Sequence, residues 1–392
     1  MLFELTNTHR KYLGLETVEP GWELVRLANG YYLYFDGDII RKSIEVTEDK
    51  YIECSMDEAT AENRSVLLPK TARGKAKKLT LATVQKCSSV GVYFAYSYGQ
   101  PKIASFTTQT TYYEGGGHER EWNGFDGLRA WLDEWMAEST EEDLAEIERF
   151  RHAGRQHCKF REGDFFRFKI GRREYGFGRI LLDIGRLRKD ESFDDNNPGL
   201  SFMGRPLIVK VYHRISSTPH EDIDVLAACG AFPSHQIMDN RFYYGDYSII
   251  GNRELMAEEL EFPIAYGRSI DWMDKDTVYL QYGLISKKTN ISKFSKYLYD
   301  ESTQDPKHYR AENPYSYSGI GWSLDALSDI PVMRRCVEEG SNEAFWNTRY
   351  LWNVSYDLRN PKLADIKRDI FGFFGLDADV GYSENLARQK KL

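Results

Sequence analysis

Cysteine is scarce in this 392-residue chain, and long apolar runs are missing from it. The five cysteines, an odd number, are widely spaced, and no two of them have the C-x-x-C spacing. This pattern argues against a disulfide framework or a zinc knuckle and favours a reducing cytoplasm. No stretch of about 18 apolar residues occurs and the mean hydropathy is -0.57, so we expect no transmembrane helix and no membrane partner. The first ten residues lack the apolar core of a secretory signal.

Catalytic and metal-binding motifs are missing as well. The eight histidines form neither H-x-H nor H-x-x-x-H, and the chain contains no P-loop, no G-x-S-x-G and no dinucleotide-binding glycine pattern after a strand. His157 and Cys158 are neighbours, but adjacent residues on a strand point to opposite faces, which is a poor geometry for sharing a proton. We therefore expect no catalytic residues, no metal site and no cofactor.

Aromatic residues and acidic residues are plentiful. The 26 Tyr and 21 Phe favour β-rich structure, because such side chains suit half-buried pleated surfaces. The length exceeds the size at which single cores usually split, so we expect two domains with a boundary near residue 155. Residues 1–155 then form an acidic α+β domain, since residues 1–150 carry 25 acids against 17 bases. Residues 156–392 form the second domain, and residues 151–392 carry 35 charges of each sign.

The first domain is expected to begin with a short helix that ends at Gly14 and to continue as a β-meander. Asn29-Gly30 between two alternating runs is a strong hairpin signal. Helices at 125–136 and 140–152 should follow, the second capped by Thr140 with Asp143 three residues later. We expect a polar, exposed loop at 57–78. Strands are expected at residues 22–27, 31–35, 39–46, 79–84, 90–98 and 103–113.

The second domain is expected to open with a β-hairpin in which Phe166, Phe168 and Ile170 alternate with basic residues. Gly176 and Gly178 in the returning strand suggest a tight bend, as at a barrel corner. We therefore predict an α+β domain built on a strongly bent, barrel-like antiparallel sheet, followed by a C-terminal helical extension. The remaining expected elements are strands at 206–212, 243–251 and 277–285, helices at 223–228, 331–339 and 365–374, and loops at 194–199 and 300–318.

Basic residues are concentrated between Arg149 and Lys189, with aromatic residues interleaved. Such a run could bind nucleic acid through phosphate contacts and stacking, or could dock an acidic protein. The alternation favours a simpler interpretation, in which the charges face solvent while the aromatic rings face the core. The bases that we single out as candidates for partner binding are Arg73, Lys75, Lys77, Lys78, Arg167, Lys169, Arg172 and Arg173.

Two neighbouring motifs carry a family resemblance. Gly163-Asp164-Phe165-Phe166 opens an apolar strand, and after a turn the chain reads Tyr175-Gly176-Phe177-Gly178-Arg179. This pattern, with the strand at 207–212, resembles the immunity protein 26 family, and the resemblance extends over about residues 158–260. It implies that Gly163, Asp164, Tyr175, Gly176, Gly178 and Arg179 determine the fold.

The resemblance implies a non-catalytic bacterial immunity protein of the cytoplasm, which binds and neutralises a cognate polymorphic toxin. Some members of the family are labelled phosphotriesterases, so a metal-dependent phosphotriester hydrolase is the alternative, and a nucleic-acid-binding protein is a third candidate. Asp164 and Arg179 stand at the outer ends of facing strands, where the two side chains could pair.

Overall fold

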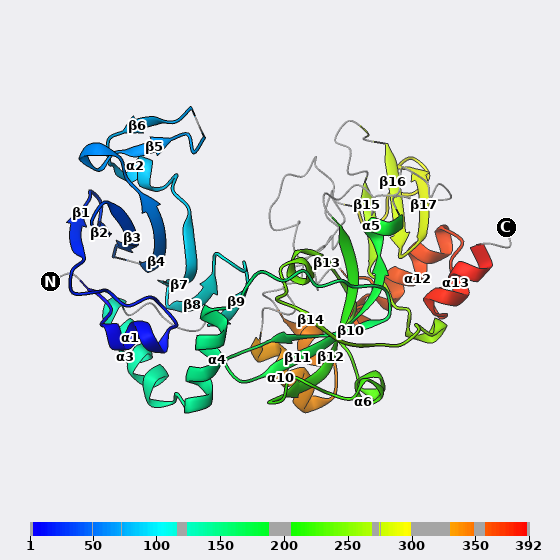
Figure 1. Ribbon diagram of the computed structural model, residues 1–392. Helices are drawn as coiled ribbons and strands as arrows, with labels where there is room; N and C mark the ends of the chain where they lie inside the picture. Colours follow the sequence, from blue (N-terminus) through cyan, green and yellow to red (C-terminus); the bar gives the residue numbers. More distant parts are fainter. Residues whose placement is uncertain are drawn as a thin grey trace. The chain divides into compact units, whose positions relative to one another are not determined.

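The computed structural model describes residues 3–48, 50–71, 73–115, 124–187, 205–268, 274, 276–298, 330–348 and 357–389. The chain divides into two compact units (Figure 1). Unit 1 comprises Met1–Cys158 and Tyr243–Asp246, and unit 2 comprises Lys159–Phe242 and Tyr247–Leu392. Helices and antiparallel sheets occur in both units, so the α+β class is confirmed. None of the helices in the described ranges has the length and apolar composition that crossing a membrane requires.

Unit 1 is built on a seven-stranded antiparallel sheet in the order β1-β2-β3-β4-β7-β8-β9. The predicted Asn-Gly hairpin is confirmed, because Leu24 lies opposite Tyr34 while Asn29 and Gly30 both have positive φ. A Cβ on Gly30 would lie 2.0 Å from the Val46 carbonyl oxygen, so only glycine fits there. The strands are β1 (Glu23–Arg26), β2 (Tyr31–Asp36), β3 (Ile39–Val46), β4 (Lys50–Ala59), β7 (Ser89–Ser97), β8 (Gln100–Ser105) and β9 (Thr111–Glu114).

Helices cover one face of this sheet. Helix α3 (Gly124–Ala137) buries Trp131 and Trp135, and the Trp131 ring stacks on Phe94 of β7 with centroids 5.6 Å apart. Helix α4 (Glu141–Arg151) begins at the predicted cap: the Asp143 backbone N–H donates to Thr140 Oγ1 at 3.2 Å, and the Thr140 N–H donates to the Asp143 carboxylate at 2.7 Å. Helix α1 (Asn7–Tyr12) packs into the same core.

The stretch between β4 and β7 is more structured than expected. Residues 57–78 contain the end of β4 and a largely exposed antiparallel ribbon of β5 (Val66–Leu68) and β6 (Lys75–Lys77). The predicted strand at 79–84 is wrong. Helix α2 (Leu81–Val84) forms there instead, because Thr80 and Thr83 cap its first turn reciprocally. The predicted strand at 103–113 is two strands, β8 and β9, separated by a turn.

Unit 2 contains a five-stranded antiparallel sheet in the order β13-β12-β11-β10-β14. Its strands are β10 (Asp164–Lys169), β11 (Tyr175–Asp183), β12 (Pro206–Ser216), β13 (His235–Met238) and β14 (Ser248–Asn252). The predicted hairpin is confirmed, and the β11–β12 register shifts between Gly176 and Gly178. The described strands leave the sheet open, however, so the predicted strongly bent, barrel-like sheet is not confirmed. The strand predicted at 243–251 is the short β14 only, which follows helix α7 (Asn240–Tyr243) and Gly245 with φ of 83°.

A second, three-stranded sheet packs against the C-terminal helices of unit 2. It consists of β15 (Ile264–Arg268), β16 (Thr277–Tyr282) and β17 (Ile285–Asn290), so the predicted strand at 277–285 is a hairpin that turns at Gly283. Two C-terminal helices are confirmed, and α12 ends before Gly375 as predicted. The loops expected at 194–199 and 300–318 lie outside the described residues. The helices are α5 (Ile184–Leu187), α6 (Ile223–Ala228), α7, α10 (Ile330–Glu339), α11 (Glu343–Asn347), α12 (Ala364–Phe373) and α13 (Tyr382–Gln389).

Candidate functional site

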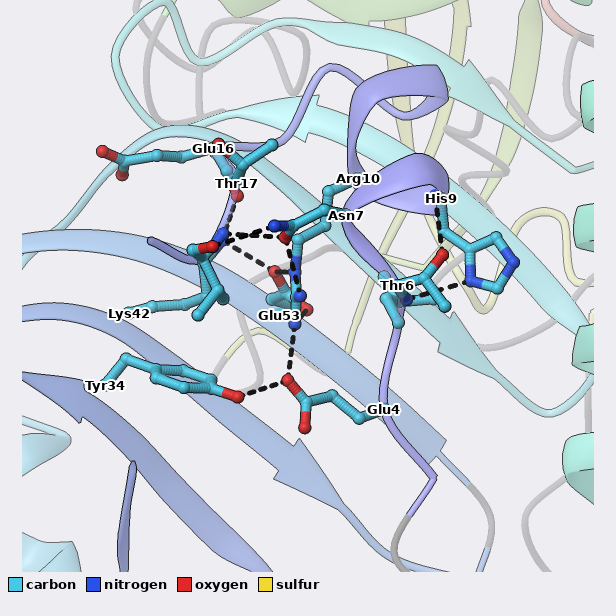
Figure 2. A network of polar contacts seen from close by, with 12 residues as sticks. Glu4, Thr6, Asn7, His9, Arg10, Glu16, Thr17, Tyr34, Lys42 and Glu53 are labelled. Carbon is cyan, nitrogen blue, oxygen red and sulfur yellow. Dashed lines mark hydrogen bonds and ion pairs between the residues drawn. The ribbon is translucent and has the colours of Figure 1, made fainter. Parts of the chain in front are cut away.

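Three charged side chains of unit 1 are almost completely withdrawn from water. Arg10 of α1, Lys42 of β3 and Glu53 of β4 are 3%, 0% and 0% exposed. Figure 2 shows them converging between the first helix and the sheet. Lys42 and Glu53 reach this place because they share the sheet face with core residues such as Ile44 and Tyr51. A buried cluster of this kind is either a reaction centre or a structural network, and its hydrogen bonds distinguish the two.

The Glu53 carboxylate is fully engaged by donors within the protein. Its Oε1 accepts hydrogen bonds from Arg10 Nε at 2.8 Å and Lys42 Nζ at 2.7 Å, and its Oε2 accepts from Tyr51 OH at 2.6 Å and Arg10 Nη2 at 3.2 Å. Burial alone would raise the pKa of Glu53, but the positive charges of Lys42 and Arg10 outweigh it and hold the pKa below the ordinary value. Glu53 is therefore an ionised carboxylate whose two oxygens each accept two hydrogen bonds.

The same network fastens the N-terminal segment to the sheet (Figure 2). Arg10 Nη2 also donates to Glu4 at 2.9 Å, and Tyr34 OH of β2 donates to the same carboxylate oxygen. Lys42 Nζ donates to the Glu16 carbonyl oxygen at 2.7 Å. Arg10 joins the first helix to β4, Lys42 joins Glu16 to β3, and Tyr34 joins Glu4 to β2. The cluster is therefore best interpreted as a structural network rather than a reaction centre. Sequence analysis missed it, although Lys42 and Glu53 occupy core-facing positions in alternating strands.

A buried arginine organises the family motif of unit 2. Arg179 on β11 is 0% exposed, and its guanidinium lies 4.5 Å from the ring centroid of Phe165, its cross-strand neighbour. The guanidinium donates to the carboxylate of Glu259 and to the backbone carbonyls of Arg253 at 2.7 Å and Glu254 at 3.0 Å. Arg179 thus holds the segment that follows β14 against the sheet.

The predicted pairing of Asp164 with Arg179 is wrong. The Asp164 carboxylate instead accepts the Arg161 backbone N–H at 2.8 Å and the Asn252 side-chain amide at 2.7 Å. The register explains the difference, because Phe165 rather than Asp164 lies opposite Arg179 in the β10–β11 pair. Asp164 therefore closes the turn before β10, while Arg179 binds a different segment.

Tight backbone approaches surround the glycines of the motif. Gly163 has φ of 85°, and a Cβ there would lie 2.4 Å from the Arg253 carbonyl oxygen. The Phe166 and Phe168 rings lie directly over Gly178 and Gly176, where added Cβ atoms would be 2.4 and 2.5 Å from the nearest ring carbons. Gly176 and Gly178 therefore make room for aromatic rings that fill the core, and Gly163 makes room for a backbone carbonyl.

The eight basic residues proposed for partner binding fall into two local groups. Two of those in unit 2 have partners in the fold. Arg167 donates to the carbonyl oxygen of Pro219, beyond β12, at 2.8 Å, and Lys169 donates to the Arg172 carbonyl oxygen in the hairpin turn at 3.2 Å. Both cations lie within about 6 Å of the Tyr175 ring centroid. Arg173 in this hairpin turn is exposed. The unit 1 group lies on and beside the β5–β6 ribbon and is exposed throughout: Arg73, Lys75, Lys77 and Lys78.

Four aromatic rings of the basic run face the core, as expected, but Arg179 of the same run is buried too, so not all of its charges face solvent. Phe165, Phe166, Phe168 and Phe177 are at most 5% exposed, so these rings cannot stack on nucleic-acid bases. The structure therefore weakens the nucleic-acid hypothesis for this part of the chain. Arg188 and Lys189, at its end, lie outside the described residues.

Metal-dependent hydrolysis finds no support in the residues that the structure describes. Among them, no three His, Cys, Asp or Glu side chains are grouped so that they could hold a metal ion. The histidines serve local contacts instead: His9 caps α1, and His213 lies 2.9 Å from the Asn342 side-chain oxygen. His118 and His308 fall outside the described ranges.

Comparison with known proteins gives one match. The model of a family described as immunity protein 26 matches residues 161–278, which include all of β10 to β15. No curated protein matches the chain, and no solved structure does. The matched segment contains Gly163, Asp164 and Arg179, whose contacts are described above. Residues 161–278 of this chain are thus similar to the immunity protein 26 family.

Proposed function

We propose that this protein is a non-catalytic immunity protein of a bacterial polymorphic toxin system, which acts in the cytoplasm by binding a cognate toxin and blocking it. The observation that carries the proposal is the family match over residues 161–278. This segment contains the complete five-stranded sheet, so the likeness covers a packed structural core rather than an isolated motif.

The contacts of the buried charged side chains support a binding role. The buried charged side chains of the two units pair with other residues of the chain: Glu53 with Lys42 in unit 1, and Arg179 with Glu259 in unit 2. Reactive groups in enzymes usually lie in accessible sites with perturbed pKa values, whereas these two side chains are closed off from solvent. A protein that neutralises its target by occlusion needs only a complementary surface.

Large side chains on the surface offer anchors for such a contact. Tyr98 is 69% exposed in the β7–β8 turn, and Tyr243 is 46% exposed beside Arg155, whose guanidinium lies 5.6 Å from the Tyr243 ring centroid. Tyrosine and arginine are enriched among residues that dominate binding energy at protein interfaces. We expect at least one of these side chains to be covered in the toxin complex.

Co-expression tests the proposal. The toxin domain encoded beside this gene is produced in a bacterial host with and without the full chain, and viable cells are counted. We expect the toxin to kill cells alone and the full chain to restore growth and to co-purify with the toxin. Killing that is unchanged in the presence of a well-expressed chain would refute the proposed function.

A further inference from the structure

The β5–β6 ribbon of unit 1 and its flanking residues carry four exposed basic side chains that make no ion pair in the described structure. In the described part of the chain, none of Arg73, Lys75, Lys77 and Lys78 makes an ion pair or a side-chain hydrogen bond, and all four are exposed. Lys70, at the start of the same turn, differs because it pairs with Glu58 of β4. The four cations therefore face solvent without an ion-pair partner among the residues that the structure describes.

Charges in unit 1 are separated along the sequence and in space. Residues 63–113 contain eight Lys and Arg and no Asp or Glu, whereas residues 114–148 contain twelve Asp and Glu against two Arg. In Figure 1 the β5–β6 ribbon and the helices α3 and α4 lie at opposite ends of unit 1. The four exposed cations of the ribbon therefore produce a local positive field that attracts negatively charged groups on a partner.

The ribbon is ordered before any partner arrives. Val66 of β5 is completely buried, and the turn is closed by hydrogen bonds from the Thr71 N–H to the Pro69 carbonyl and from the Gly74 N–H to the Thr71 carbonyl, both 2.8 Å long. A Cβ at Gly74 would lie 2.6 Å from the Pro69 oxygen, so the turn requires glycine. A backbone held in place in this way loses little conformational entropy on binding, so the entropy cost falls mainly on the exposed side chains.

We propose that the β5–β6 ribbon docks onto an acidic protein surface. The inference rests on the proposed function, in which that surface belongs to the toxin. Protein is favoured over nucleic acid for two reasons. Residues 66–78 contain no aromatic side chain that could stack on bases. The acidic α3–α4 end of the same unit would also repel an extended polyanion, whereas a compact acidic patch meets only the ribbon.

Association kinetics with the toxin domain test the surface. The variant replaces three lysines on and beside β6 with glutamine: Lys75→Gln, Lys77→Gln and Lys78→Gln. We expect its association rate at low salt to fall by about tenfold relative to the unchanged chain, and its salt dependence to flatten, because charge steering acts mainly on the encounter rate. An association rate within twofold of the unchanged chain would overturn the inference.

A matched control removes the same net charge elsewhere. It replaces three exposed cations that lie outside the ribbon and the basic run and make no ion pair in the described structure: Lys11→Gln, Arg26→Gln and Lys293→Gln. We expect this control to associate within about twofold of the unchanged chain. If the control slows as much as the ribbon variant, net charge rather than the ribbon steers the encounter, and the inference fails.

A second probe separates this inference from the proposed function. If no toxin complex forms with the unchanged chain, the proposed function fails, and labelled poly-L-glutamate is then titrated against the full chain, the ribbon variant and the control. Binding that only the ribbon variant loses supports an acid-binding ribbon. Equal binding by all three proteins overturns it, as does tighter binding of duplex DNA at the same salt.

Lysines on a short edge strand can also prevent strand-to-strand association. Self-association of the ribbon variant, with its binding to the toxin or to polyglutamate unchanged, would assign the lysines that role instead.

Discussion

At the residue scale, the buried charged side chains of unit 1 form a network in which both oxygens of the central carboxylate are hydrogen-bonded. Glu53 accepts four hydrogen bonds, and two of its donors, Arg10 and Lys42, carry positive charge. Removing one partner from such a network strongly lowers the free energy of unfolding, because the remaining charges stay buried without an opposite charge. The network is therefore expected to fix the N-terminal segment on the sheet.

The substitution Glu53→Gln tests this role. We expect it to lower the free energy of unfolding of unit 1 by about 3–5 kcal/mol, since Arg10 and Lys42 would face a neutral amide. Asp57→Asn on the same strand is the control, because Asp57 is 66% exposed in its pair with Arg41 and should contribute at most about 1 kcal/mol. Native-state hydrogen exchange of the β4 amides in urea measures both changes. Equal effects of the two substitutions would contradict the structural role.

Acid should weaken the same network. The pKa of Glu53 in the folded protein lies below its ordinary value of 4.5, so its stabilisation is fully present above pH 4.5 and disappears as the pH falls through the folded-state pKa. The difference in unfolding free energy between the unchanged chain and Glu53→Gln should therefore shrink between pH 7 and pH 3. A difference that stays constant over this range would show that the Glu53 charge does not contribute.

Sequence reasoning at this scale identified residue types but not long-range partners. The alternation places Lys42 in phase with buried Ile44, which could have indicated a buried charge. Nothing local to the sequence, however, joins Arg10 to Glu53, 43 residues away. The predicted Asp164–Arg179 pair failed for the same reason, because Glu259, the partner of Arg179, lies 80 residues along the chain.

At the element scale, the glycines of β11 should be more sensitive than a nearby turn glycine. A Cβ at Gly178 would lie 2.4 Å from the Phe166 ring and 2.7 Å from the Lys210 carbonyl oxygen, and the backbone atom cannot move away easily. We expect Gly178→Ala to lower the free energy of unfolding of unit 2 by about 1–3 kcal/mol, as other overpacked cores do.

Gly171→Ala is the matched control for that substitution. In the hairpin turn, a Cβ on Gly171 would meet only a Glu174 side-chain oxygen at 3.7 Å, so we expect a change within about 0.5 kcal/mol. Hydrogen exchange of the β11 and β12 amides compares the two variants. If Gly178→Ala proves as mild as Gly171→Ala, Gly178 does not determine the fold.

Elements were predictable where one local signal dominated. The Asn29-Gly30 turn and the Thr140 cap each specify a backbone geometry, and both are observed. Residues 79–84 carry two signals, an apolar alternation and the Thr80–Thr83 cap, and the cap prevails because it satisfies the first backbone N–H groups of the helix. The motif glycines led to the prediction of a strongly bent, barrel-like sheet, which is not confirmed, because closure of a sheet depends on its outer strands and not on these glycines alone.

At the scale of the whole molecule, the family match and the exposed charge lie in different units. The matched residues 161–278 belong mainly to unit 2, whereas the β5–β6 ribbon belongs to unit 1. The sequence supplied the family resemblance and the basic residues. It could not show which basic side chains are hydrogen-bonded within the fold, because that depends on tertiary contacts such as the one between Arg167 and the Pro219 carbonyl.

A binding mechanism and a catalytic one differ in stoichiometry. A protein that occludes a toxin inhibits one toxin molecule per binding site and cannot act again while the complex persists. An enzyme that destroys the toxin, or reverses its effect, turns over and protects at low molar ratios. The proposed function requires the first behaviour.

Titration of purified protein into a fixed, active concentration of the toxin domain tests this directly. The toxin is held well above the dissociation constant of the complex, and its residual activity is measured against molar ratio. We predict a linear loss of activity that ends near one molecule of this protein per toxin and does not deepen with time. Complete inhibition at a small fraction of that ratio, or full toxin activity in the presence of excess protein, would contradict neutralisation by binding.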